Sequence, residues 1–280
     1  MVAFALGVMP GTDMVAAADV IAGETGDVRA IPRLPARGIM SDAVGATCAL
    51  LPDAPVAAGP RSWRLEARPQ LITRRLWDQA ERDLDLLEAE WGSSGFTVQV
   101  AALGPWSLAA QVELPNGHLA VTDSGALHDL TEIVTYGLAE HASRLRRRFH
   151  GEVNIQVNEP LLAALNRGEI AGTNDFDVLR PIPAKELGER LHYVFESLPG
   201  RLLLGSGSRP LFDVARIAQP DAIIVPRSAL VGSELLDGCT ATLDAGIGVS
   251  LGCVALGNDV DDARDVAIRI AQLFDELRMD

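Results

Sequence analysis

The sequence has few aromatic residues, a single lysine and no long apolar run. Aromatic residues make up 5% of the 280 residues, and Lys185 is the one lysine among 24 basic residues, which we attribute to codon usage. No apolar run reaches the roughly 18 residues that a membrane-spanning helix needs. A hydrophobic fraction of 48% is too high for a disordered chain. The sequence therefore predicts a folded protein with a large buried core and no membrane partner.

Cysteine is also scarce, and its spacing excludes a disulfide framework. Cys48, Cys239 and Cys253 are an odd number, lie far apart and form no C-x-x-C pair. The segment 1–13 is apolar, but it has no basic residue before its apolar stretch and is broken by glycine and proline. We therefore expect a buried strand there and no signal peptide. Both features favour a reducing, cytoplasmic location.

Basic residues are outnumbered by acidic ones. The chain has 38 Asp and Glu against 24 Lys and Arg, a formal net charge of −14. An acidic surface repels nucleic-acid phosphates and anionic lipid headgroups. We therefore expect no nucleic-acid partner and no role at a membrane surface.

Short apolar runs alternate with longer segments of helical period, which is typical of a mostly parallel α/β sheet. We expect one domain over residues 1–280, with no internal repeat. The helices with the clearest pattern are 71–91 and 124–149, and a final amphipathic helix runs to about 277. The predicted strands are 3–8, 96–103, 152–157, 201–204, 222–225 and 249–254.

An arginine cluster ends the segment 124–149. It is either an anion site or a solvated last turn that complements the helix dipole, and we favour the second interpretation. The cluster consists of Arg144, Arg146, Arg147 and Arg148.

In parallel α/β folds, binding and catalytic residues lie where the strands end. Reading the predicted strand ends in order gives three short motifs: LGVMPGT at 6–12, GPWSLA at 104–109 and VNEP at 157–160. These motifs and their order resemble cobalamin-independent methionine synthase, above all its short single-barrel relatives, in the superfamily shared with uroporphyrinogen decarboxylase. The resemblance covers roughly residues 3–255.

The resemblance implies a TIM-barrel-like (β/α)8 fold and methyl transfer from a folate, or in short forms a corrinoid protein, to a thiolate held on zinc. Zinc would lower the pKa of the thiol. Where the family has D-E-P, this chain has Asn158-Glu159-Pro160. Glu159 then keeps a role near a substrate amino group and is the candidate catalytic residue, with Asn158 beside it. The candidate substrate-binding residues at the strand ends are Met9, Thr12, Gly104, Trp106, Gly205, Ser206 and Gly207. For Trp106, core packing is the alternative interpretation.

The zinc ligands that the resemblance implies are absent from this sequence. Gly205, Ser206 and Gly207 stand where the family has H-x-C, and Val225-Pro226 stands where an acidic ligand is expected. The family's last ligand is a cysteine on the eighth strand, and the sequence ends at Asp280, before that strand is expected. The five histidines form no alternative ligand spacing. We therefore predict no metal and no other cofactor.

The turn Gly205-Ser206-Gly207-Ser208 allows three interpretations. Its backbone N–H groups could hold an anion, the loss of His and Cys side chains could have opened a pocket, or it is a simple tight turn. It matches neither a dinucleotide-binding glycine motif nor a P-loop.

Two functions follow. The first is a homologue of a methyltransferase that has lost zinc chemistry and binds or senses a small molecule in the barrel mouth. The second is an active, metal-free enzyme of the same superfamily in which Glu159 is general acid and base for a small thiol or carboxylate. A third interpretation is an unrelated doubly wound α/β protein with strand order 3-2-1-4-5.

The expected missing strand predicts a distorted or incomplete barrel. Residues 63–66 or 241–243 are candidates for a replacement strand, and a second copy of the chain is the other way to cover the exposed edges. We therefore expect a homodimer.

Overall fold

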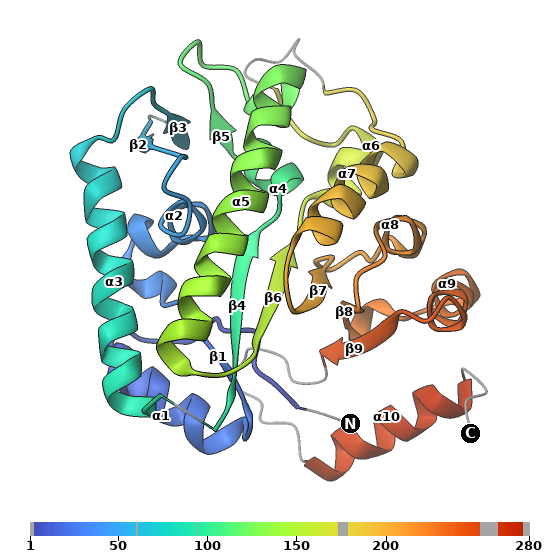
Figure 1. The fold of residues 1–280 in the computed structure, drawn as a ribbon. Helices are drawn as coiled ribbons and strands as arrows, with labels where there is room; N and C mark the ends of the chain where they lie inside the picture. The colour runs from blue at the N-terminus through green and yellow to red at the C-terminus, as the bar shows by residue number, and fades with distance from the viewer. Residues whose placement is uncertain (1–2, 60, 94, 173–178, 253–262, 277–280) are drawn as a thin grey trace.

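The computed structural model describes residues 3–59, 61–93, 95–172, 179–252 and 263–276 (Figure 1). Its main feature is a parallel sheet whose strand order, over the described residues, is β1-β4-β6-β7-β8-β9. The strands of this sheet are β1 (Val28–Ala30), β4 (Thr97–Leu103), β6 (Val153–Asn158), β7 (Arg201–Gly205), β8 (Ala222–Pro226) and β9 (Gly248–Gly252).

The strand order rises along the chain without reversing, and the sheet is curled into a half-barrel. A doubly wound sheet would reverse its order at a switch point. The observed order therefore excludes the 3-2-1-4-5 interpretation. It confirms the prediction of an α/β, TIM-barrel-like fold that is incomplete.

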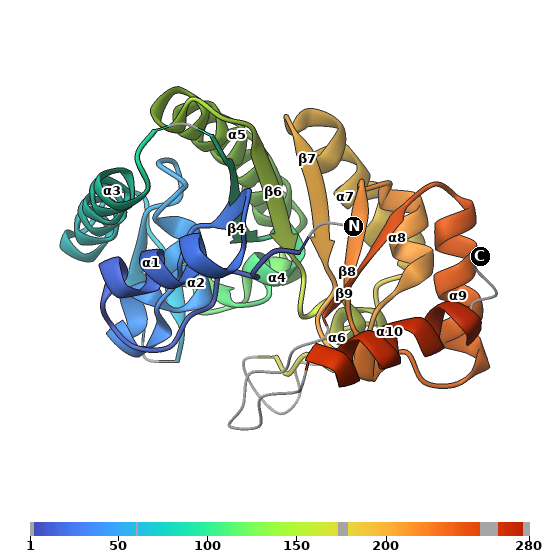
Figure 2. The same cartoon turned by 90° about the horizontal axis from the view of Figure 1, so that it is seen from below.

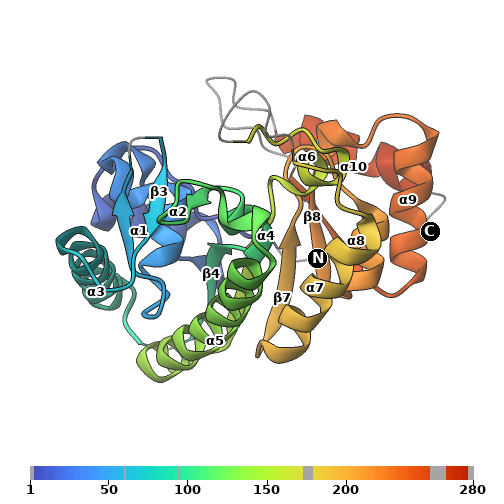
Figure 3. The ribbon, with the colours of Figure 1, turned by 90° about the horizontal axis from the view of Figure 1, so that it is seen from above.

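Helices α5 and α7 lie on one side of the curled sheet, whereas α10 lies on the other (Figures 2 and 3). No helix in the described ranges is long and apolar enough to cross a membrane. The helices are α1 (Met14–Glu24), α2 (Ala43–Cys48), α3 (Leu71–Trp91), α4 (Pro105–Ala109), α5 (Ser124–Phe149), α6 (Leu162–Arg167), α7 (Ala184–Ser197), α8 (Phe212–Ala218), α9 (Ser233–Asp244) and α10 (Ala263–Glu276).

The central strands form because they can be buried on both faces. In β6 the apolar residues Val153, Ile155 and Val157 are at most 1% exposed, and the intervening Gln156 is also buried. A strand covered on both faces needs apolar or hydrogen-bonded residues at successive positions, which is the pattern seen here. One continuous hydrophobic core runs from Met14 on α1 to Leu273 on α10.

The long helices α3 and α5 have the bounds that their periodicity predicts. Leu76, Leu84, Leu87 and Trp91 of α3 are buried along one stripe, as expected for an amphipathic helix. Asp123 caps α5, its carboxylate accepting from the backbone N–H of Ala126 at 2.9 Å.

The strand predicted at 3–8 is wrong. Val8 makes one isolated parallel bridge to Arg33, and Gly7 has φ +87°, which interrupts an extended chain. The first strand is instead β1, within a segment where the sequence analysis predicts no strand. The charge of Arg29 in β1 is accommodated because its guanidinium lies 4.2 Å from the centre of the Phe96 ring and donates to the carbonyl of Trp91.

Neither candidate replacement strand joins the main sheet. Residues 241–243 lie within α9, so that prediction is wrong. Residues 63–65 do form a strand, but it belongs to a second sheet of order β2-β3-β5 in the described chain. The strands of this small sheet are β2 (Val56–Ala58), β3 (Trp63–Leu65) and β5 (Val112–Glu113). The last predicted strand is seen as β9, and its predicted end at 253–254 lies outside the described residues.

Candidate functional site

A cavity of about 840 Å³ opens at the carboxyl ends of the parallel strands. Its volume is in the range of cavities that hold drug-sized molecules. Every strand of the main sheet contributes a residue at or just beyond its end. These residues are Arg33 after β1, Leu103 of β4, Asn158 of β6, Gly205 of β7, Arg227 after β8 and Gly252 of β9.

The cavity continues from the strand ends into the space beside α2 and α3, where its wall is apolar. Arg269 of α10 also lines the cavity. The apolar residues of this wall include Met40, Ala43, Ala46, Leu50, Leu76, Ala80, Leu84 and Leu87. The cavity therefore combines a polar region at the strand ends with a long apolar region.

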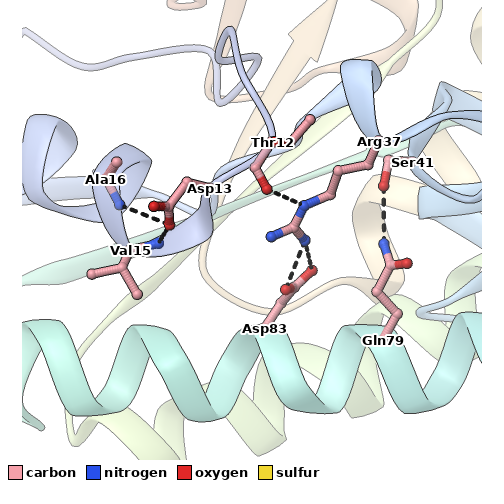
Figure 4. A network of polar contacts seen from close by, with 8 residues as sticks. All are labelled: Thr12, Asp13, Val15, Ala16, Arg37, Ser41, Gln79 and Asp83. Carbon is pink, nitrogen blue, oxygen red and sulfur yellow. Dashed lines mark hydrogen bonds and ion pairs between the residues drawn. The ribbon is translucent and has the colours of Figure 1, made fainter.

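Arg37, which lines the cavity, is held by hydrogen bonds to Thr12 and Asp83 (Figure 4). Its Nη1 donates to both carboxylate oxygens of Asp83 at 2.8 and 2.9 Å, and its Nε donates to the carbonyl of Thr12 at 2.8 Å. Beside this pair, Gln79 of α3 donates to the hydroxyl of Ser41 at 2.9 Å. These contacts tie the loop after β1 to α3, and the charge of Arg37 is neutralised by Asp83.

Asn158 lies in the cavity at the end of a chain of buried amides. Gln99 donates to Gln156 at 2.9 Å, and Gln156 donates to the side-chain oxygen of Asn158 at 2.8 Å. Asn158 is in register with Gly205 on the neighbouring strand. A Cβ atom at position 205 would lie 2.2 Å from the Asn158 oxygen, so glycine is required there. The cavity floor is therefore fixed by hydrogen bonds within the sheet.

Glu159 points away from the cavity. Side chains alternate along a strand, so Glu159 faces the opposite side of the sheet from Asn158. Its two carboxylate oxygens accept from the backbone N–H groups of Trp106 at 3.0 Å and Ser107 at 2.7 Å, at the start of α4. The side chain is fully buried.

Burial raises the pKa of Glu159 to about 7. Hydrogen bonds from Ser107 and Trp106 favour the charged form and oppose this shift. The carboxyl is thus poised to change its charge near neutral pH, although it is occupied by the backbone of α4. Gly104 is part of this arrangement, because a Cβ there would lie 2.2 Å from a Glu159 oxygen.

The other predicted site residues divide between the cavity and its surroundings. Gly205 and Gly207 line it, together with Asn158. Trp106 is fully buried and donates from its indole to the carbonyl of Leu187 at 3.1 Å, which is a core-packing role. Ser206 is also buried, and its hydroxyl donates to the carbonyl of Ile224 at 3.3 Å.

Met9 and Thr12 lie next to the loop that carries the cavity arginines. The backbone N–H of Met9 donates to the carbonyl of Arg33 at 3.0 Å, and the side chain of Met9 packs against the core. Thr12 contacts Arg37 through its carbonyl. Both residues position the loop after β1.

The turn after β7 does not lead directly into a helix. Gly207 has φ +70°, and a Cβ there would lie 3.0 Å from the Cα of Pro160, so the turn needs glycine. Helix α8 begins only at Phe212. This geometry is that of a tight turn between neighbouring strand ends.

The residues at the expected zinc position do not fit zinc. Gly205 and Gly207 have no side-chain donor, the hydroxyl of Ser206 is directed at a backbone carbonyl, and Pro226 replaces the acidic ligand. Among the residues that the structure describes, no three His, Cys, Asp or Glu side chains gather closely enough to hold a metal ion. Cys253 lies outside those residues.

His141 of α5 was not indicated by the sequence as a cavity residue. It is buried and lines the apolar end of the cavity, and its Nε2 has no hydrogen-bond partner among the described residues. Burial, and to a lesser degree Arg144, lowers its pKa to about 4. The imidazole is therefore neutral at physiological pH.

Sequence reasoning also missed Arg33 and Arg227. Arg227 lies two residues after the end of the predicted strand 222–225, and this position could have indicated it. No strand was predicted before Arg33, because the three-residue strand β1 is too short to recognise.

No protein-family model matches the chain, and no curated protein sequence matches it. Several solved structures are similar, and two of them are described here. A methyltransferase from Methanosarcina mazei has 12% identity and a TM-score of 0.49, covering 95% of this chain and 85% of that one. A B12-independent methionine synthase from Shewanella sp. W3-18-1, in complex with selenomethionine, has 14% identity and a TM-score of 0.48. That match covers 76% of this chain, which spans 59% of the length of the synthase.

The two are a methyltransferase and a methionine synthase, the kinds of protein that the strand-end motifs resemble.

Proposed function

We propose that the protein binds a small organic molecule in the cavity at the strand ends, as a binding or regulatory homologue of a methyltransferase that has lost zinc chemistry. The observation that carries this proposal is the cavity of about 840 Å³, to which all strands of the described main sheet contribute. Sites in barrel-like α/β folds lie at this end of the sheet. The absence of ligating side chains at Gly205, Ser206 and Gly207 supports a function without zinc.

A cavity-filling variant tests the binding. Ala80 of α3 lines the cavity, and a phenyl ring at this position would occupy part of the apolar region. We expect Ala80→Phe to weaken the binding of a neutral fluorescent probe, N-phenylnaphthylamine, on the order of tenfold or more, since packing mismatches cost about 1–3 kcal/mol. The matched control is Ala89→Phe, at an exposed position of the same helix. Equal binding by wild type and Ala80→Phe would contradict the proposal.

Metal content tests the loss of zinc chemistry. We expect elemental analysis of protein purified without chelators to find zinc well below one atom per chain. Zinc near one per chain would overturn this part of the proposal, and methyl transfer to homocysteine would then be assayed directly.

One observation favours a second function, a metal-free enzyme in which Glu159 is general acid and base. A pKa of about 7 is suited to proton transfer at neutral pH. In this function the carboxyl exchanges its contacts with α4 for contacts with a small thiol or carboxylate substrate. The rate would then follow a single titration near pH 7.

Glu159→Gln separates this function from a structural role. If the protein transfers a methyl group from a methyl-folate to homocysteine by this route, we expect the variant to lose turnover. Circular dichroism checks that the variant is folded. Glu152→Gln, at an exposed glutamate, is the control. A folded Glu159→Gln protein with wild-type turnover would remove Glu159 from catalysis.

A further inference from the structure

Two arginines in the cavity carry charges that the described part of the protein leaves uncompensated. Arg33 follows β1 and Arg227 follows β8, and both line the cavity. The two strands are four steps apart in the sheet order, about 19 Å along a flat sheet at about 4.8 Å per strand. Both arginines line one cavity because the sheet is curled.

The guanidinium group of Arg227 lacks acceptors among the described residues. Its Nε is buried and has no hydrogen-bond partner in the part of the chain that the structure describes. Its guanidinium makes no ion pair with any residue in the described ranges. A buried guanidinium N–H without an acceptor costs free energy, and such groups in native structures are usually satisfied by a ligand or water.

Arg33 is also undercompensated. Its one hydrogen bond from the side chain, to the carbonyl of Ser41, is long at 3.3 Å. Burial lowers its pKa, and the carboxylate of Asp42 only partly opposes this shift. Both oxygens of Asp42 are already engaged, one by the backbone N–H of Gly45 at 2.6 Å and one by the indole of Trp63 at 2.9 Å.

The carboxylates that line the cavity do not change this balance. Among the described lining residues, Asp83 is the one acidic side chain, and it is held by both of its oxygens on Arg37. Among the described lining residues, no further carboxylate is therefore available to Arg33 and Arg227. This excess of positive charge is found in a chain whose net charge is −14.

We propose that the cavity binds an amphipathic organic anion, with its carboxylate or phosphate head between Arg33 and Arg227 and its apolar body along α2 and α3. The inference rests on the proposed binding function and names the class of ligand. Guanidinium groups match carboxylate and phosphate oxygens in geometry and charge. The apolar wall formed by residues such as Ala46, Ala80 and Leu84 matches an uncharged chain or ring.

The test compares three probes with the same apolar chain: decanoate, decyl phosphate and decanol. Each is titrated by calorimetry below the concentration at which it forms micelles. We expect both anions to bind wild-type protein at least tenfold more tightly than decanol, since hydrogen bonds to charged groups contribute more than neutral ones. Whichever anion binds more tightly, carboxylate or phosphate, identifies the head group, and either result supports the inference.

Two variants locate the head group. Arg33→Gln and Arg227→Gln each remove one charge, and we expect each to weaken decanoate or decyl phosphate on the order of tenfold to a hundredfold while leaving decanol unchanged. Arg147→Gln, at an exposed arginine of α5 away from the cavity, is the matched control. If Arg33→Gln fails to fold, Arg227→Gln carries the test, since the described structure gives the Arg227 side chain no contact whose loss would unfold the protein.

The outcomes separate this inference from the proposed function. Decanol binding as tightly as decanoate, with no change in the arginine variants, would overturn the anionic head group and leave a binding cavity. If none of the three probes binds, and Ala80→Phe has no effect on N-phenylnaphthylamine, both the inference and the proposed function are wrong.

Discussion

The polar side chains around the sheet serve two different purposes. Asn158 faces the cavity, whereas its neighbour Glu159 is committed to the backbone of α4. Adjacent residues in one motif thus act on opposite sides of the sheet. A resemblance between motifs treats them as one unit, and only the alternation of the strand separates them.

The buried imidazole of His141 makes the free energy of unfolding depend on pH. The pKa of His141 is about 4 in the folded protein and about 6.5 in the unfolded chain. Between these two pH values the imidazole is protonated in the unfolded chain and neutral in the folded protein, so protonation favours unfolding. This group therefore contributes stability above pH 6.5 that is lost as the pH falls toward 4. We expect His141→Leu to remove this pH dependence. Between pH 7 and pH 4 the free energy of unfolding of wild type should therefore fall by up to about 3 kcal/mol more than that of the variant.

Urea unfolding at several pH values measures this effect. His128→Leu, at an exposed histidine of the same helix, is the control. Unfolding free energies of wild type and His141→Leu that run parallel from pH 7 to pH 4 would contradict the prediction.

Some of the residues that line the cavity could be predicted from the sequence. Asn158, Gly205 and Gly207 were indicated because they follow apolar runs, and they line the cavity. The arginines were not indicated, because which loops meet depends on the curl of the sheet. Local pattern does not contain that information.

Helices α3 and α5 are joined by ion pairs. Arg148 contacts Asp85 and Glu88 of α3, the latter at 2.7 Å, and Arg144 pairs with Glu81. Two members of the arginine cluster therefore connect helices, in addition to any interaction with the helix dipole. The sequence could not show this, because the acidic residues lie about 60 positions away.

We expect Arg148→Gln to lower the free energy of unfolding by about 1 kcal/mol at low salt, since one half-buried arginine contacts several carboxylates. The loss should shrink at high salt, where such charges are screened. Chemical denaturation at two salt concentrations checks this. Arg147→Gln is the matched control, and an equal loss in both variants would indicate an effect of helix propensity.

The strength of the sequence pattern decided which elements were predicted correctly. The 21 residues of α3 and 26 residues of α5 repeat an apolar stripe many times, so their bounds were predicted from the sequence. β1 has three residues with a charge in the middle, and it is stabilised by contacts of Arg29 with Phe96 and Trp91. Tertiary contacts of this kind leave no periodic signal.

At the scale of the whole molecule, the half-barrel leaves the sheet open. In the described chain β1 and β9 are the end strands of the main sheet, and parallel edges are sites for pairing. We propose that a second copy of the chain covers an edge. Light scattering coupled to size exclusion should then give twice the chain mass of 29.8 kDa at micromolar concentration. A mass of one chain would contradict the dimer.

The alternation of short apolar runs and long helices predicted a mostly parallel α/β sheet, whereas the barrel-like fold was implied by the resemblance of the strand-end motifs. Monotonic strand order, parallel pairing and a cavity at the strand ends all follow from one repeated unit. How far the barrel closes could not be predicted from the sequence, because closure depends on which segments can reach the edges of the sheet.

The contact between Glu159 and Gly104 links two distant positions of the chain. A side chain at 104 has no room while the carboxylate occupies its present place. A smaller residue at 159 would free that space, but it would leave the backbone N–H groups of Trp106 and Ser107 without an acceptor. The two positions are therefore coupled: a side chain at position 104 requires a smaller residue at position 159, and a smaller residue there requires another acceptor for the start of α4.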